Sequence, residues 1–224
     1  MDKVKTTIVT GHYGSGKTEF CVNLALDIAK RGEKVTIADL DVVNPYFRSR
    51  EAAAKLASRG ITLASDHFGG NSGQDLPAAS FAFLSNVRAE ENVIIDLAGG
   101  KVGTRLLAAC YDAIKSVPYE FLCVLNLFRP ETSTAAQMID FINTINAEVA
   151  LPITGLVNNG NLLHDSTADH ILSSQKAVMT AANALGLPLR YTLIHAELYK
   201  GMENMIQSDE VLLFDKLQMR ESWQ

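Results

Sequence analysis

The sequence has few cysteines, and no two of them lie close together. Its three cysteines, Cys21, Cys110 and Cys123, each stand among apolar neighbours and form no Cys-x-Cys or Cys-x-x-Cys pair. Disulfide frameworks and structural zinc sites depend on such pairs. We therefore expect buried free thiols in a reducing compartment.

Long apolar runs and clusters of basic residues are also missing. No uninterrupted apolar run approaches the roughly 18–20 residues that a membrane span requires. The 20 Lys and Arg residues are spread along the chain and the formal net charge is −5, whereas surfaces that coat nucleic acid concentrate positive charge. Met1–Thr10 carries Asp2 and leads directly into a candidate strand, so we expect no signal peptide. These absences predict a cytoplasmic protein that binds neither membranes nor nucleic acid.

The bulk composition is that of an ordinary globular protein. The chain has 224 residues, of which 47% are hydrophobic and 20% are charged. That length supplies one substantial core and is short for two domains. With no repeat and no shift in composition along the chain, we expect a single domain over residues 1–224.

Short apolar segments alternate with longer helical patterns from end to end. Val93, Ile94 and Ile95 are apolar on consecutive residues, which is typical of strands covered on both faces. The predicted strands are Thr7–Thr10, Lys34–Asp39, Asn92–Asp96, Glu120–Leu127, Ile153–Asn158 and Leu189–Leu193. The predicted helices are Lys17–Arg31, Ser49–Ser58, Ala78–Arg88, Glu131–Asn146 and Thr167–Leu185. This alternation predicts an α/β fold with a mostly parallel sheet and helices on both of its faces.

The segment Gly11–Thr18 reads Gly-His-Tyr-Gly-Ser-Gly-Lys-Thr and matches the phosphate-loop pattern G-x-x-x-x-G-K-[ST] between a strand and an amphipathic helix. Glycines let the backbone curl around an anion with its N–H groups pointing inward, and the helix adds its positive N-terminal end. Lys17 would contact the β- and γ-phosphates, and the Thr18 hydroxyl would ligate Mg²⁺. We expect the nucleotide to be bound by Gly11, Gly14, Ser15, Gly16, Lys17, Thr18 and Glu19.

Two further segments place carboxylates at strand ends. Asp96 ends a strand and is followed by Gly99 and Gly100; beside a phosphate loop it would hold Mg²⁺ through water, although such residues also form turns or cap helices. Asp39 and Asp41 end another strand and point the same way, so they could bind the ion and orient an attacking water. Asp41 could instead cap the turn before Pro45. The expected metal-binding residues are Thr18, Asp39, Asp41 and Asp96, and the expected catalytic residues are Lys17 and Asp41.

In their order and spacing, these three motifs resemble the MinD/ParA and CobQ/CobB-like branch of P-loop NTPases, from Thr7 to about Leu193. The resemblance implies a three-layer P-loop NTPase fold with a sheet of about seven strands. It also implies that Asp41 orients the hydrolytic water, that Asp96 belongs to the Mg²⁺ shell, and that Asn158 contacts the base.

The chain departs from that branch in several places. MinD/ParA-type loops carry a second lysine after the first glycine, and this lysine reaches the partner's nucleotide in a dimer; here that residue is His12. A homodimer of that kind is therefore not expected, although another homodimer stays open.

Glu19 follows Thr18, where small or hydroxyl residues are usual. Cys110 has no second cysteine suited to holding a cluster. Asp209–Glu221 has an apolar stripe but more acids than bases, which opposes anionic lipid and predicts a docked terminal helix.

The strand end Asn158-Asn-Gly-Asn161 bears on the choice of base. GTPases of the Asn-Lys-x-Asp type use a carboxylate to bind guanine, and this segment has none. A neutral amide can accept a hydrogen bond from adenine N6 and donate one to N7, so ATP is favoured over GTP. The same residues also make a good loop, in which case Asn161 has no ligand role.

The motifs predict a Mg²⁺-dependent ATP-binding protein and slow ATPase whose nucleotide state regulates a protein partner. Two alternatives stay open: an ATP-dependent kinase or synthetase for a small molecule, of the CobB and dethiobiotin-synthetase type, and a binding module with negligible turnover. The Gly- and Asn-rich loop Ser65–Pro77, with His67, could supply a substrate pocket or be a plain surface connection. Arg48 and Arg50 could contact phosphate or simply face solvent.

Overall fold

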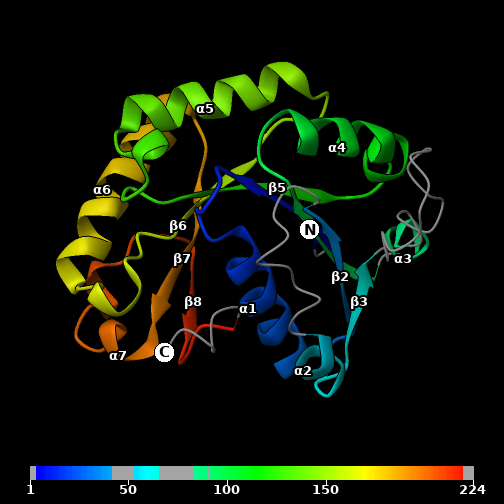
Figure 1. Ribbon diagram of the computed structural model, residues 1–224, viewed down its shortest axis with the longest axis horizontal. Coiled ribbons are helices and arrows are strands. Elements are labelled where there is room, and N and C mark those ends of the chain that lie inside the picture. Colours follow the sequence, from blue (N-terminus) through cyan, green and yellow to red (C-terminus); the bar gives the residue numbers. More distant parts are fainter. Residues whose placement is uncertain (1–3, 42–52, 66–82, 90, 219–224) are drawn as a thin grey trace, which may run out of the picture.

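A central sheet of eight parallel strands organises the chain (Figure 1). The computed structural model describes residues 4–41, 53–65, 83–89 and 91–218. The strand order is β3-β2-β4-β1-β5-β6-β7-β8, and all seven neighbouring pairs are parallel. The strands are β1 Thr6–Gly11, β2 Val35–Leu40, β3 Ile61–Ser65, β4 Asn92–Leu97, β5 Tyr119–Leu125, β6 Gly155–Asn158, β7 Leu189–His195 and β8 Glu210–Phe214.

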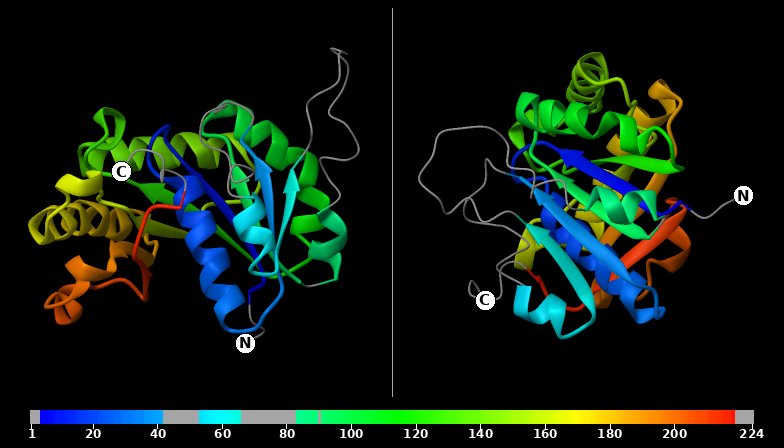
Figure 2. Two further views of the ribbon diagram at one scale, coloured as in Figure 1. Left: turned by 60° about the horizontal axis from the view of Figure 1, so that its bottom comes forward. Right: turned by 90° about the vertical axis from the view of Figure 1, so that its right-hand side faces the viewer.

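Helices cover both faces of the sheet, which makes three layers (Figure 2). One face carries α1 and α2 and the other carries α3, α4, α5 and α6, as the two large buried clusters show. The helices are α1 Lys17–Lys30, α2 Ala53–Ala57, α3 Leu84–Arg88, α4 Lys101–Ile114, α5 Ala135–Glu148, α6 Ala168–Leu185 and α7 Ala196–Tyr199, with short 3₁₀ helices η3 Pro130–Thr132, η4 Leu163–Asp165 and η5 Glu203–Met205. The predicted α/β architecture is confirmed.

The six predicted strands are all present, and the sheet contains two more. One of these, β8, corrects the predicted terminal helix. Val211, Phe214 and Leu217 are spaced as on a helix, but Leu212 and Phe214 are 5% and 6% exposed while Leu213 is 41% exposed. This alternation is the burial pattern of a strand, and pairing with β7 satisfies its backbone.

Helix α4, whose first turn contains Gly103, was not among the helices predicted from the sequence. Glycine weakens a helix in isolation. In the folded chain, however, a Cβ at Gly103 would lie 1.9 Å from the carbonyl oxygen of Ala98, so close packing at this turn requires glycine. The loop segment after Ser65, with His67, and the two arginines Arg48 and Arg50 lie outside the described residues.

The core consists of two large apolar layers, one on each side of the sheet, and a smaller cluster around Ile171, Ile194 and Met202. The three cysteines are buried free thiols within it, as expected. Along the described part of the chain, no helix combines the length and apolarity needed to span a membrane. Because all strands are parallel, their carboxyl ends meet at one edge, where ligands of open α/β sheets bind.

Candidate nucleotide and magnesium site

The phosphate loop leaves β1 at Gly11 and enters α1 at Lys17. The N–H of Ser15 donates to the carbonyl of His12 at 3.1 Å, which closes the turn. Gly14 and Gly16 have positive φ angles of 73° and 89°, which other residues rarely adopt. A Cβ at Gly16 would also lie 2.1 Å from the side-chain nitrogen of Asn159. Packing as well as backbone conformation therefore requires this glycine.

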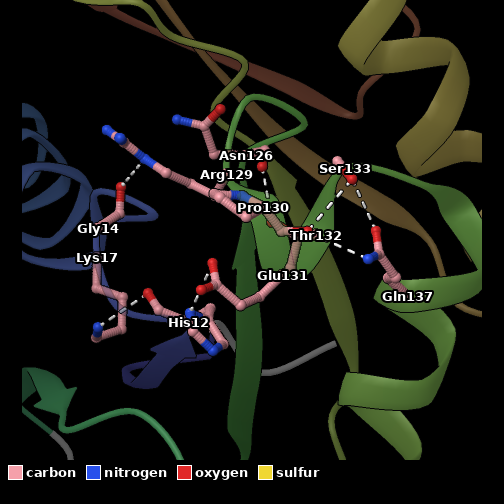
Figure 3. Close-up of polar contacts among 10 residues, drawn as sticks. All are labelled: His12, Gly14, Lys17, Asn126, Arg129, Pro130, Glu131, Thr132, Ser133 and Gln137. Atoms are coloured by element: carbon pink, nitrogen blue, oxygen red, sulfur yellow. Dashed lines mark hydrogen bonds and ion pairs between the residues drawn. The ribbon is translucent and has the colours of Figure 1, made fainter.

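Lys17 is held at the entrance of α1 although only 6% of it is exposed. Its Nζ donates to the carbonyl of His12 at 3.4 Å and lies 4.0 Å from Oδ2 of Asp41, which is also 6% exposed. The ammonium group is thus fixed beside the loop whose backbone curls around it (Figure 3). The structure brings together Lys17 and Asp41, the two residues predicted to be catalytic.

Thr18 and the carboxylates of Asp39 and Asp96, at the ends of β2 and β4, form a second group of polar side chains in the site. The hydroxyl of Thr18 donates to Oδ2 of Asp96 at 2.6 Å. Asp39 is the register partner of Asp96 across β2 and β4, and its Oδ1 accepts a hydrogen bond from the N–H of Asp41 at 3.2 Å. Burial and the charge of Asp39 raise the pKa of Asp96 to about 7, against the opposing effects of Lys17 and Thr18. A cation would be stabilised among these acids.

These residues fit Mg²⁺ as it is usually bound beside phosphates. No group of three His, Cys, Asp or Glu residues suited to a metal ion occurs within the described ranges. Mg²⁺ next to a phosphate loop does not need one, because a hydroxyl, a carboxylate acting directly or through water, and phosphate oxygens complete its shell. Thr18 and Asp96 could supply the hydroxyl and the carboxylate. Oδ1 of Asp96 is buried and accepts no hydrogen bond from the described residues.

A cavity of about 330 Å³ opens over the phosphate loop. Its walls bring together residues that the sequence analysis selected and others that it did not. The lining residues are Tyr13, Gly14, Gly16, Lys17, Thr18, Glu19, Asp41, Asn126, Arg129, Pro130, Glu131, Asn161, Leu163 and Leu217. The space and its two basic lining residues, Lys17 and Arg129, suit the phosphates and sugar of a nucleotide.

Three residues that make hydrogen bonds in or beside this cavity were not predicted from the sequence. Asn159, 4% exposed, donates from Nδ2 to the carbonyl of Ser15 at 2.7 Å and so joins the turn after β6 to the phosphate loop. Arg129 donates from Nε to the carbonyl of Gly14 at 2.8 Å (Figure 3). Asn126 donates from Nδ2 to the carbonyl of Asn161 at 3.1 Å. Each contact joins segments that are far apart in the sequence, and no local sequence pattern predicts it.

Asn158 lies elsewhere. It is fully buried, its Oδ1 accepts from the hydroxyl of Ser174 at 2.7 Å, and its Nδ2 donates to the carbonyl of Ile171 at 3.5 Å. Its amide ties β6 to α6, and it is not among the residues that line the cavity. Asn161 lines the cavity instead. The structure therefore does not bring Asn158 into the group around the phosphate loop.

Glu19 lines the cavity and also holds the C-terminal segment. Its Oε1 accepts from Nδ2 of Asn23 and from the N–H of Gln218, both at 2.8 Å. These bonds place the segment after β8 against the start of α1. Leu217, the neighbour of Gln218, consequently forms part of the cavity wall.

His12 is turned toward its own chain. Its Nδ1 lies 3.6 Å from Oε2 of Glu131, and its ring meets the ring of Phe141 edge to face at 5.6 Å. The side chain thereby packs against η3 and α5. Cys110, on α4, is a buried core residue, and burial raises the pKa of its thiol to about 12.

A second and larger cavity of about 620 Å³ adjoins the first. The two share Asn161, Leu163 and Leu217. Leu163 has a positive φ of 59°, an uncommon conformation for leucine. The lining is mainly apolar by area and includes Ile171, Leu193, Leu198 and Phe214, and its further polar residues are His164, Ser166, His195, Glu197 and Lys216.

Solved structures of similar fold include proteins of signal recognition. The cell division protein FtsY of Thermotoga maritima shares 21% identity at a TM-score of 0.58, over 87% of this chain and 63% of that one. The signal recognition particle receptor FtsY of Elizabethkingia anophelis in complex with GDP shares 20% identity at 0.54, over 86% and 58%. The 54 kDa signal recognition particle protein of Aeropyrum pernix in complex with GDP shares 16% at 0.57, over 98% and 44%.

At these identities the likeness concerns the fold alone, and this chain spans less than two thirds of the length of those structures. None of the curated proteins matches the chain. A family model described as the CobQ/CobB/MinD/ParA nucleotide binding domain matches residues 6–199. The match covers most of the chain, including the phosphate loop, Asp41, Asp96 and Asn159. The chain therefore belongs to the CobQ/CobB/MinD/ParA nucleotide-binding family of P-loop NTPases.

Proposed function

We propose that this protein is a Mg²⁺-dependent ATP-binding protein and slow ATPase, formed by one domain over residues 1–224, whose nucleotide state regulates a partner protein. The observation that supports this most directly is the meeting of Lys17, Thr18, Asp41 and Asp96 at one edge of the sheet. A triphosphate, its metal ion and an attacking water are the groups that such an arrangement serves.

Each residue has a task that follows from its chemistry. Lys17 and the loop N–H groups bind the phosphates, and Thr18 and Asp96 hold Mg²⁺, with Asp39 and Asp41 beside it. The ion, when bound, neutralises charge on the phosphates. Asp41, close to Lys17, orients a water whose oxygen bonds to the γ-phosphorus as the bond to the bridging oxygen breaks. ADP keeps the electron pair of that bond, and the proton of the water leaves with the phosphate.

We propose that adenine is the preferred base. The turn after β6 reads Asn158-Asn-Gly-Asn161, and its side chains are amides without a carboxylate. Asn161 lines the cavity, where a neutral amide can pair with both N6 and N7 of adenine. The structures of the Elizabethkingia and Aeropyrum proteins contain GDP, so GTP is the competitor to measure. We expect ATP to bind about 1–3 kcal/mol more tightly, since a mismatched base edge leaves polar groups unpaired.

A second function is favoured by the adjoining cavity of about 620 Å³. A kinase or synthetase for a small molecule needs a substrate site beside its nucleotide, and this cavity shares the lining residues Asn161, Leu163 and Leu217 with the nucleotide cavity. Its mainly apolar lining suits a substrate with a substantial hydrocarbon part.

The experiment that tests the proposal measures binding and turnover in one preparation. Calorimetry with ATP and GTP, each with Mg²⁺ and with EDTA, gives the base preference and the metal requirement. Phosphate release alone, and then with a panel of small carboxylic acids and amines, separates the two functions. Slow phosphate release that the small molecules leave unchanged supports the regulatory ATPase. A pull-down with the ATP-bound protein would then identify its partner. Release that depends on one compound supports the synthetase, and absence of nucleotide binding contradicts both.

A further inference from the structure

We propose that Arg129 supplies, from within the same chain, a second positive charge to the terminal phosphate, and that it acts mainly when this phosphate is transferred. The inference rests on the proposed function and adds a catalytic residue to it. Arg129 lines the same cavity as Lys17 and Thr18. It comes from the segment after β5, 115 residues away from Gly14, whose carbonyl it contacts.

The backbone of Arg129 is fixed by a compact turn. The N–H of Arg129 donates to the carbonyl of Asn126 at 3.2 Å, and its own carbonyl accepts from the N–H of Thr132 at 3.0 Å. The hydroxyl of the fully buried Thr132 donates to the carbonyl of Asn126 at 2.7 Å. Asn126, 2% exposed, also accepts from the N–H of Phe128 at 3.0 Å. The side chain therefore starts from a rigid position, which reduces the entropy lost when it binds a ligand.

The side chain lies flat against the phosphate loop. Its Nε donates to the carbonyl of Gly14, and a Cβ added at Gly14 would meet Nε at 3.4 Å and Cζ at 3.7 Å. These are ordinary contact distances, so the guanidinium group lies directly against Gly14. In Figure 3 the two terminal nitrogens of Arg129 extend beyond the Gly14 carbonyl.

The N–H groups of those two terminal nitrogens donate no hydrogen bond to the described residues. Across the described residues, the only hydrogen bond of the Arg129 side chain is the one from Nε, and no carboxylate forms an ion pair with it. By contrast, Arg190, outside the site, is paired with Glu120 and Asp209. A guanidinium with a free fork suits two phosphate oxygens at once. Glu131, two residues on, is directed to His12 instead.

His12 does not provide this charge. Its ring packs on Phe141 and faces Glu131, so it is turned toward η3 and α5. As the bond between the γ-phosphorus and the bridging oxygen breaks, negative charge grows on oxygens next to Gly14 and Lys17. A cation fixed on Gly14 stabilises that charge more than it stabilises bound ATP, so its effect falls on the rate.

The test uses the full chain with Arg129→Ala, Arg129→Gln and Arg129→Lys, and Arg59→Ala as the control, an arginine exposed before β3. The readouts are thermal stability, the affinities for ATP and ADP by calorimetry, the affinity for ADP with aluminium fluoride, and phosphate release. Arg129→Ala is expected to lower the rate by at least about 100-fold, as for loss of one group that stabilises the transition state. It should weaken the aluminium fluoride complex much more than ADP alone.

The conservative variants separate charge from structure. Arg129→Lys, which loses the Nε contact but keeps a charge, should recover part of the rate and of the aluminium fluoride affinity, while Arg129→Gln should recover neither. If all three variants lose only thermal stability, Arg129 is a structural contact of Gly14 and the inference is wrong. If the unsubstituted protein binds no nucleotide, the proposed function fails first; if it binds and turns over ATP while Arg129→Ala does the same, only the inference fails.

Discussion

Lys17 carries positive charge into the first turn of α1, where it is 6% exposed and contacts the phosphate loop through His12. Replacing it with alanine should leave the fold intact, because α1 stays attached to the sheet through its apolar face. Nucleotide affinity should fall by at least about 100-fold, since a charge-assisted contact to phosphate is among the stronger polar interactions. Calorimetry checks this, with Lys30→Ala at the other end of α1 as the control. Unchanged ATP affinity in Lys17→Ala would refute the phosphate-site assignment.

Asp41 separates binding from chemistry. Its Oδ2 lies 4.0 Å from Nζ of Lys17, the group proposed to bind the β- and γ-phosphates. If it orients water, Asp41→Ala keeps ATP affinity within a few-fold and slows hydrolysis by roughly 10²–10⁴, the usual contribution of a positioned acid–base group. Titration and turnover are measured on the same sample. An equal loss of both would assign Asp41 to Mg²⁺ binding or to structure.

The residues that sequence reasoning could find are those whose role is local. Gly14 and Gly16 can be recognised from their spacing before Lys17, because the loop, the start of the helix and the lysine all lie within the eight residues Gly11–Thr18. Asn159 and Arg129 act on the same loop from 144 and 115 residues away. Only the parallel sheet brings them there, so a single sequence carries no signal for either contact.

At the scale of elements, consecutive apolar residues predicted the central strands well, since a strand buried on both faces tolerates little else. The prediction was weakest where a pattern fits two structures. In Glu210–Phe214 the apolar residues suit either a strand or a helix, and only the free edge of β7 decides in favour of β8. In α4 the glycine that disfavours a helix is the residue that lets this helix approach Ala98.

Helix α6 positions the turn after β6 and can be tested through its cap. The hydroxyl of Thr167 accepts from the N–H of His170 at 3.3 Å at the first turn, while the hydroxyl of Thr180, inside the same helix, donates to the carbonyl of Lys176. Thr167→Ala should reduce the free energy of unfolding by about 1 kcal/mol, because an N-terminal N–H loses its partner. Thr180→Ala should be neutral or stabilising, since alanine favours a helix interior. Chemical denaturation of both variants checks the pair; equal losses would mean that the cap contributes nothing specific.

At the scale of the whole molecule, all the side chains proposed to bind or transfer phosphate come from one chain. Lys17, Thr18, Asp41, Asp96 and Arg129 line or adjoin one cavity, and His12, which stands where MinD/ParA-type loops carry a lysine that crosses to a partner, packs against Glu131 and Phe141 of its own chain. A nucleotide enclosed between two subunits is therefore not required by this arrangement.

The prediction is that ATP does not create a dimer. Light scattering with and without a non-hydrolysable ATP analogue should give the same mass, and any dimer should persist without nucleotide, through a surface away from the phosphate loop. The rate of hydrolysis per chain should also stay constant as the protein concentration is raised about 100-fold, because a site completed by a second chain would become more active as dimers form. A dimer that appears only with the analogue, or a rate that rises with concentration, would show that a group from a second chain completes the site.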